Sequence, residues 1–131
     1  SALVYNPSNI GALNNYAYYL SVERRELDKA EEMSFKTVKA EPKNSTYLDT
    51  YAWILFEKGN YAEARIYIDE ALKNGGEQSD VIVEHSGDIY YMTGDVENAL
   101  KFWKKALEMG SKSATIKKKI EQKKYITEWK D

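Results

Sequence analysis

The sequence predicts an all-α fold, a right-handed α-solenoid of antiparallel helix hairpins with a C-terminal capping helix. Three observations lead to this prediction. Related segments recur 35 residues apart, apolar residues within each segment follow helical spacing, and a glycine occurs where two of the predicted hairpins turn. Similarity at a fixed period of this length is typical of stacked helical repeats, in which each unit buries its apolar face against its neighbours.

The central repeat occupies residues 48–72 and contains two amphipathic helical patterns joined by a Gly-Asn turn. Each pattern places its apolar residues on one face of a helix. Gly59 lies where the first helix must end in a left-handed conformation, which glycine tolerates best. The two apolar faces consist of Leu48, Tyr51, Ala52 and Leu55 in the first helix and Ala64, Ile68, Ala71 and Leu72 in the second.

Copies of this repeat lie on both sides of it. The segments that begin at Leu13, Leu48 and Val83 read LNNYAYYL, LDTYAWIL and VEHSGDIY. The first unit contains one extra residue, within residues 21–25. The pattern predicts helices at about 9–22, 27–40, 45–58, 61–74, 80–93 and 96–109. The expected N-cap residues of the three first helices are Asn9, then Asn44 or Ser45, and Asp80.

These repeats predict a single domain over residues 1–131. Residues 1–9 end like the other repeats and are interpreted as the end of a truncated upstream repeat. The last segment lacks the repeat pattern, but Ile116 and Ile120 form a narrow apolar stripe among lysines, as a helix that caps the last apolar face requires. The predicted units are residues 1–9, three repeats at 10–44, 45–79 and 80–110, and a capping helix at 111–131.

Composition excludes several classes of function. The chain has no cysteine, which excludes disulfides, thiolate metal sites and a cysteine nucleophile. No apolar run approaches ~18 residues, so no membrane span is predicted. Residues 1–100 contain nine Lys and Arg against seventeen Asp and Glu, whereas residues 101–131 contain ten Lys against four Asp and Glu. The acidic body argues against nucleic acid as a partner. Binding of the basic segment to nucleic acid or an anionic membrane is the alternative to its capping role.

The repeats resemble the tetratricopeptide repeat (TPR) over about residues 2–110. The first repeat departs from the TPR pattern, with Thr37 where alanine is usual and no turn glycine. The variants LNNYAYYL and LDTYAW resemble those of bacterial multi-repeat TPR proteins, several of which are exported or envelope-associated, so the compartment stays open between a bacterial cytoplasm and a periplasmic or envelope-associated location. The matching residues are Leu13, Tyr16, Ala17, Leu20, Ala30 and Pro42 in the first repeat, Leu48, Tyr51, Ala52, Leu55, Gly59, Ala64, Ile68 and Ala71 in the second, and Val83, Ser86, Gly87, Tyr90, Gly94, Ala99, Trp103 and Ala106 in the third.

This resemblance implies that the first helix of each hairpin lines a concave surface that binds a protein or peptide partner. The surface is expected to be acidic and to expose aromatic rings, which fits apolar or cationic side chains of a partner. For Phe56, packing between the helices is the alternative. The predicted partner-binding residues are Asn14, Tyr18, Asp49, Trp53, Phe56, Glu84, His85, Asp88 and Tyr91.

One subclass of TPR domains binds chaperone C-terminal carboxylates through Lys, Asn, Lys and Arg side chains in the groove. The equivalent positions in this chain contain neither lysine nor arginine. A carboxylate would therefore meet an acidic wall, and this ligand is not expected. The positions concerned are Asn14, Tyr18, Thr50, Val81 and His85.

No catalytic, cofactor or metal site is predicted. Glu84, the single histidine His85 and Asp88 lie close together on one predicted helix, but a metal site needs more converging ligands. Phosphate-binding loops and hydrolase motifs do not occur in the sequence. The predicted function is a non-enzymatic protein–protein interaction module. The alternative is a structural segment of a longer TPR solenoid that mediates assembly or forms a homo-oligomer through its open N-terminal end.

Overall fold

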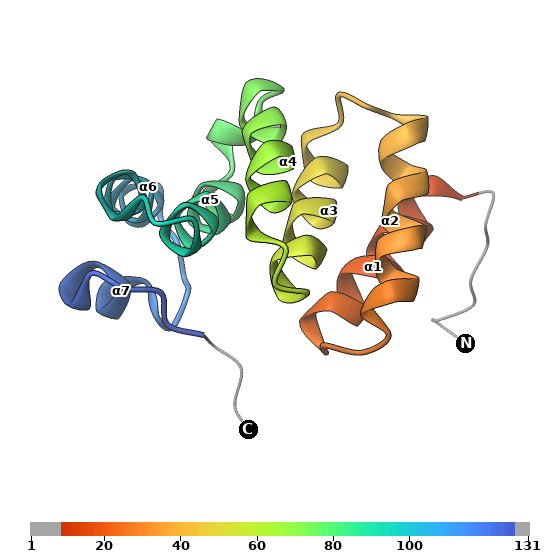
Figure 1. Cartoon of the computed structure of the whole chain (residues 1–131). Coiled ribbons are helices and arrows are strands. Elements are labelled where there is room, and N and C mark those ends of the chain that lie inside the picture. The colour runs from red at the N-terminus through yellow and green to blue at the C-terminus, as the bar shows by residue number, and fades with distance from the viewer. Residues whose placement is uncertain (1–8, 128–131) are drawn as a thin grey trace.

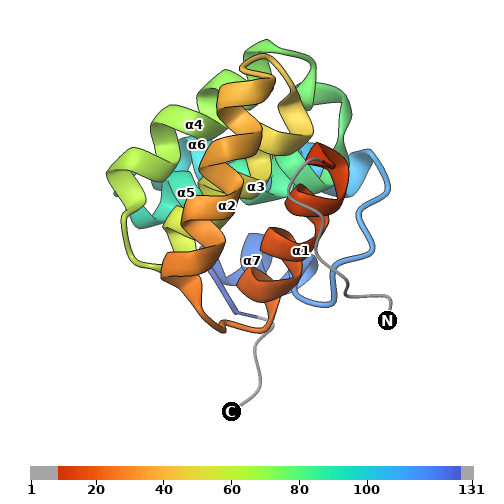
Figure 2. The same ribbon diagram turned by 90° about the vertical axis from the view of Figure 1, so that its right-hand side faces the viewer.

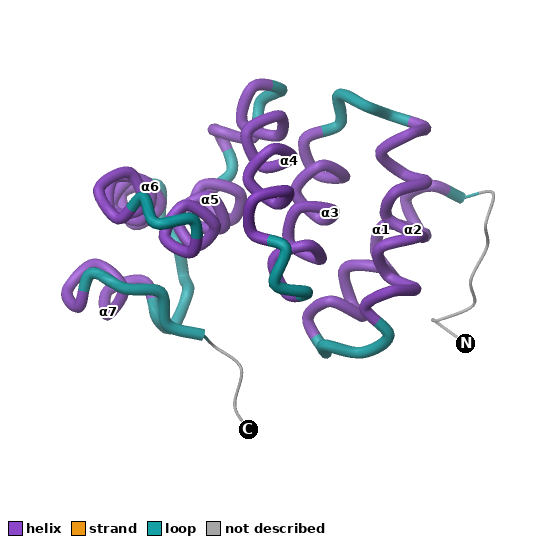
Figure 3. Tube along the Cα trace, viewed as in Figure 1, coloured by secondary structure: helices purple, strands orange, loops and turns teal. Residues whose placement is uncertain are grey.

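The computed structural model describes residues 9–127, which form seven α-helices and one short 3-10 helix and contain no strand (Figure 1; Figure 3). The first six α-helices begin and end within one residue of their predicted positions, and the prediction of an all-α helical-repeat solenoid is confirmed. The elements are α1 (Ile10–Val22), α2 (Leu27–Ala40), α3 (Ser45–Glu57), α4 (Tyr61–Lys73), η1 (Gly76–Gln78), α5 (Asp80–Met92), α6 (Val96–Glu108) and α7 (Ile116–Gln122).

The first six helices form three hairpins that stack side by side along the molecule (Figure 1). Helix pairs α1–α2, α3–α4 and α5–α6 make the hairpins, and contacts of α2 with α3 and of α4 with α5 join each hairpin to the next. The first helices of successive hairpins also contact each other, α1 with α3 and α3 with α5. Helices α1, α3 and α5 therefore line one common face of the stack.

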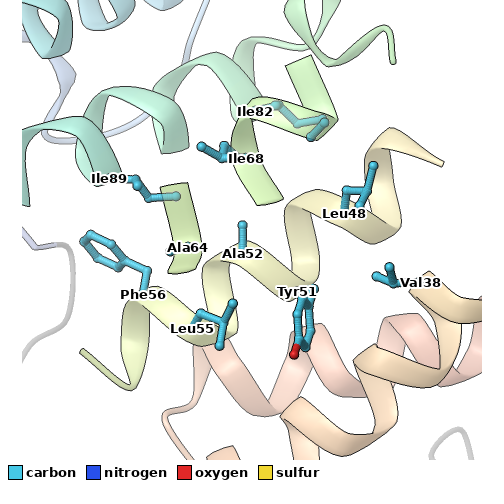
Figure 4. Close-up of a cluster of buried hydrophobic side chains, with 11 residues drawn as sticks. Val38, Leu48, Tyr51, Ala52, Leu55, Phe56, Ala64, Ile68, Ile82 and Ile89 are labelled. Carbon is cyan, nitrogen blue, oxygen red and sulfur yellow. The ribbon is translucent and has the colours of Figure 1, made fainter. Parts of the chain in front are cut away.

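The central hairpin is buried from both sides. Figure 4 shows Val38 of α2 on one side of α3, and Ile82 and Ile89 of α5 on the other. Small residues allow the helices to approach closely, since Ala52 and Ala64 have no exposed surface. The apolar stripes that a lone hairpin would leave in water are thus covered by its two neighbours, as the repeat pattern requires.

The turns and N-caps follow local rules with two exceptions. Gly59 and Gly94 end α3 and α5 with φ of 85° and 92°, but the longer first turn uses Arg24 and Glu26 with φ of 52° and 45°. Side chains of Asn9 and Asn44 cap α1 and α3 as predicted, by accepting backbone N–H bonds of 2.9 and 3.1 Å. The prediction for α5 is wrong, because Ser79 accepts the capping bond and Asp80 is the first helical residue.

The capping helix is shorter than the predicted 111–131. Before it, the hydroxyl groups of Ser111 and Ser113 accept backbone N–H bonds in successive turns, which compete with helix formation. After it, Lys123 has a left-handed φ of 56° and ends α7. Ile116 and Ile120 pack against the apolar cluster of the third hairpin, so the predicted stripe is confirmed.

Two predictions concern the chain ends and membranes. Residues 1–8, interpreted as the end of an upstream repeat, lie outside the described residues, and self-association through this end stays a prediction.

Within residues 9–127, no helix has the length and apolar content that a membrane span needs.

We expect Gly87→Ala to destabilise the protein. A Cβ atom at this position would overlap the indole ring of Trp103, which is fully buried, so the ring must shift within the core. Overpacking of this kind costs about 1–3 kcal/mol. Gly11→Ala is the matched control, because it adds the same methyl group to a helix where the nearest side-chain atom is 3.5 Å away. Urea unfolding should show a loss for Gly87→Ala and little change for Gly11→Ala, which lies in the first turn of α1; equal stabilities would contradict this account.

Candidate partner-binding groove

A cavity of ≈ 650 Å³, which we call the groove, lies on the face formed by α1, α3 and α5. Residues 109–113 and 125–127, on either side of α7, form its opposite wall. Figure 2 shows α7 and the adjoining chain on the same side of the stack as α1. The groove therefore lies between the first helices of the hairpins and the C-terminal segment of the same chain.

Trp53 and His85 line the middle of the groove wall, and the buried Phe56 ring lies behind them. Trp53 stacks on the His85 ring with centroids 4.0 Å apart and on the Phe56 ring at 4.5 Å. The His85 Nδ1 atom lies 2.8 Å from an Asp49 carboxylate oxygen. Burial disfavours the charged imidazolium, but the carboxylates of Asp49, Asp88 and Glu84 outweigh burial, and the pKa of His85 is raised. His85 thus contacts both the Trp53 ring and the Asp49 carboxylate.

A buried ion cluster lies beside the rings. The Lys119 ammonium group of α7 donates to Glu84 at 2.9 Å and to Asp88 at 2.8 Å, and its residue is 2% exposed. The Trp103 indole N–H also donates to Asp88, at 3.0 Å, and the Ser111 hydroxyl donates to Glu84 at 2.8 Å. Burial raises the pKa of Asp88 to about 6, although Lys119 favours its charged form. Burial also disfavours the Glu84 carboxylate, but Lys119 and Ser111 outweigh that effect and lower its pKa.

Asp49, Glu84 and Asp88, which the sequence predicts as acidic partner contacts, have partners within the fold. All three are buried, and their charges are bound by His85 and Lys119 of the same chain. The sequence contained a signal for Lys119, because it lies on the same helical face as Ile116 and Ile120 rather than on the outer face of α7. A lysine on an apolar stripe requires buried carboxylates, and α5 supplies two.

The other predicted residues divide into groove and core positions. Tyr18 lines the groove and is 36% exposed, and Trp53 lines it half-buried. For Phe56 the alternative holds, since it is buried and contacts the rings of Tyr61 and Tyr125. Tyr91 packs near Trp103, with ring centroids 5.9 Å apart, rather than lining the groove. Asn14 is buried, and its side-chain oxygen accepts no hydrogen bond from the described residues.

The rim of the groove contains residues that were not among the predicted partner contacts. Val22, Val81 and Met109 line it with more than a third of their surfaces exposed. Arg24 and Glu57 form an ion pair across its first end, with nitrogen and oxygen 3.5 Å apart. Burial raises the pKa of Glu57 against the opposing effect of Arg24. Arg24 and Met109 were missed because they lie in a turn and a loop outside the helices of the repeat pattern.

The described residues contain no group of three His, Asp or Glu arranged to bind a metal ion. The side chains of Glu84 and Asp88 both bind Lys119, whereas His85 contacts Asp49. The three side chains therefore do not converge on one point. The groove is thus lined by aromatic and apolar side chains beside carboxylates that already have partners within the chain.

Comparison with solved structures identifies the architecture. The first TPR domain of Spaghetti (RPAP3), solved with the HSP90 peptide SRMEEVD, superposes with a TM-score of 0.78 at 15% identity, over 90% of this chain and 92% of that one. The Sgt2 TPR domain of Aspergillus fumigatus gives 0.76 at 18% identity, over 92% and 80%. The chain has the TPR fold. The yeast Sti1 TPR2AB domain in its complex with pHSP90 also superposes on this TPR domain, with a TM-score of 0.65 at 23% identity over 86% and 46%.

The likeness to these TPR domains is one of fold and not of sequence. No protein-family model and no curated protein matches the sequence of this chain. The resemblance of the repeats to TPR sequences is thus confirmed at the level of structure. The bacterial origin indicated by the repeat variants stays a prediction.

We expect the single histidine to titrate above its ordinary pKa of 6.5. Its imidazole signals can be assigned in NMR spectra without ambiguity, and Asp49→Asn should lower the pKa by removing the nearest carboxylate. A folded pKa above the unfolded value stabilises the fold fully below pH 6.5, and this contribution is lost as the pH rises through the folded pKa. His85→Gln should therefore flatten the pH dependence of stability above pH 6.5. A titration below 6.5 in the unaltered protein would contradict the assignment.

We expect Lys119→Met to destabilise the protein by about 3–5 kcal/mol, because it leaves two carboxylates buried without a cation. Lys118→Met is the matched control on the exposed face of the same helix and should change stability by less than about 0.5 kcal/mol. Adding Glu84→Gln and Asp88→Asn to Lys119→Met should recover part of the loss. Equal unfolding midpoints for the two lysine variants would show that the ion cluster is not required.

Proposed function

We propose that this TPR domain is a non-enzymatic protein–protein interaction module whose groove binds a segment of a partner protein. The observation that carries the proposal is the groove itself, a cavity of ≈ 650 Å³ along the first helices with Trp53 in its wall and exposed apolar side chains at its rim. Volumes of this size and lining are typical of ligand sites. Two domains of the same fold support it, since their structures include an HSP90 peptide and pHSP90.

The chemistry of the groove favours an apolar or aromatic segment over an acidic one. Arg24 binds Glu57 and Thr127, and Lys119 binds two carboxylates, so these cations already have anionic or polar partners. The buried acids are neutralised in the same way, which weakens the selection for positive charge expected from the sequence. Tyr18 and Trp53 remain the best candidates for contact, since aromatic side chains dominate binding energies at protein interfaces.

A peptide display library selected against the immobilised domain tests the proposal. We expect selected peptides to contain aromatic or large aliphatic residues, and to lose about 30-fold in affinity, or about 2 kcal/mol, on Tyr18→Ala or Trp53→Ala. Tyr19→Ala is the matched control, because Tyr19 is exposed to a similar extent but does not line the groove. Peptides that bind all three variants alike would place the binding surface elsewhere and sink the proposal.

A further inference from the structure

The chain that follows α7 turns back into the groove. Lys123 adopts a left-handed conformation, and the Lys124 N–H donates to the Lys119 carbonyl oxygen at 3.2 Å, which reverses the chain direction. Tyr125, Ile126 and Thr127 then line the groove opposite α1 and α3. We call residues 123–127 the strap.

Tyr125 is the aromatic anchor of the strap. Its ring meets the Phe56 ring edge to face, with centroids 5.3 Å apart and an interplanar angle of 81°. The Lys119 ammonium group lies 5.3 Å from the same ring centroid, in cation–π geometry. Tyr125 thus occupies an aromatic subsite formed by α3 and α7, next to the stack of Trp53 on Phe56.

Thr127 binds the opposite end of the molecule. Its hydroxyl oxygen accepts a hydrogen bond of 3.0 Å from the Arg24 guanidinium group, although the two residues are 103 positions apart. Arg24 lies in the turn of the first hairpin, whereas the strap begins at α7 behind the third. The strap therefore crosses the groove from its last hairpin to its first.

The strap is bound less firmly than the helix before it. Helix α7 is fixed by Ile116 and Lys119, each 2% exposed, whereas Tyr125 is half-buried and Thr127 is exposed. A lysine in the left-handed region is also disfavoured relative to glycine, so the turn at Lys123 resists closure. Less contact therefore holds the strap than holds α7 and its ion cluster.

We propose that the strap is a displaceable occupant of the partner groove, and that a partner segment takes its place with an aromatic side chain followed two residues later by a hydrogen-bond acceptor. This inference rests on the proposed function and names its ligand chemistry. The aromatic side chain replaces Tyr125 on Phe56 and beneath the Lys119 ammonium group, and the acceptor replaces Thr127 at Arg24. A strap closed for about 90% of the time weakens the apparent affinity of such a segment about tenfold.

The test uses the full chain and a capped peptide with the strap sequence Lys-Lys-Tyr-Ile-Thr as the probe, followed by the indole N–H resonance of Trp53 in NMR spectra. We expect the peptide to bind the Tyr125→Ala variant with saturation and to bind the unaltered chain at least tenfold more weakly. Lys124→Ala is the matched control in the same segment and should behave like the unaltered chain, because Lys124 is exposed. A peptide with alanine in place of tyrosine should not bind.

Thr127→Val provides a second variant that leaves the core untouched and should give an intermediate gain in peptide affinity. Equal affinities for the unaltered chain and both strap variants, or no saturable binding to Tyr125→Ala, would overturn the inference. Library-selected peptides measured in parallel separate the two proposals. If they bind the strap variants and the unaltered chain equally but still lose affinity on Tyr18→Ala, the groove binds partners and only the strap inference fails.

Discussion

The buried ion cluster around Lys119 determines the shape of the groove. Two carboxylates of α5 lie 2.9 and 2.8 Å from one ammonium group, at positions with almost no solvent contact. Removing the Lys119 ammonium group, or its two carboxylate partners, leaves a buried charge without a counter-ion, and this lowers the free energy of unfolding by several kcal/mol. The pairing therefore fixes α7 against α5, and the apolar contact of Ile116 with the third hairpin acts in the same direction. Once α7 is fixed, the chain that leaves it at Lys123 is directed into the groove.

The same cluster changes what the groove can recognise. From the charges of α5 alone, the concave surface is strongly acidic and suited to a cationic ligand. Lys119 supplies a counter-charge to Glu84 and Asp88, and His85 lies within hydrogen-bond distance of Asp49, so each buried acid has a partner within the chain. Under the proposed function, binding energy comes from the half-buried ring of Trp53 and the exposed apolar rim, where desolvation is favourable rather than costly.

Sequence reasoning succeeded where the structure depends on neighbours within one repeat. The 35-residue period placed six helices within one residue, because close approach of helices demands small residues such as Gly87 at fixed positions. It placed Tyr18 and Trp53 on the groove but also assigned Tyr91 there, which instead packs near Trp103. It missed Lys119 because the lysine and its carboxylates are 31 and 35 positions apart, and the run of three lysines resembles a solvated surface.

The strap is an exception to the locality of a repeat protein. In a stack of hairpins each unit contacts its neighbours, so the first and third hairpins are coupled only through the second. The bond between Arg24 and Thr127 joins the first hairpin to the segment that follows the last helix. Arg24 also binds Glu57 of α3, so the bond reaches the central hairpin as well. A partner segment that displaces the strap, as proposed, breaks this contact between the first hairpin and the chain after α7. To keep the first and third hairpins linked, the partner segment has to contact both of them.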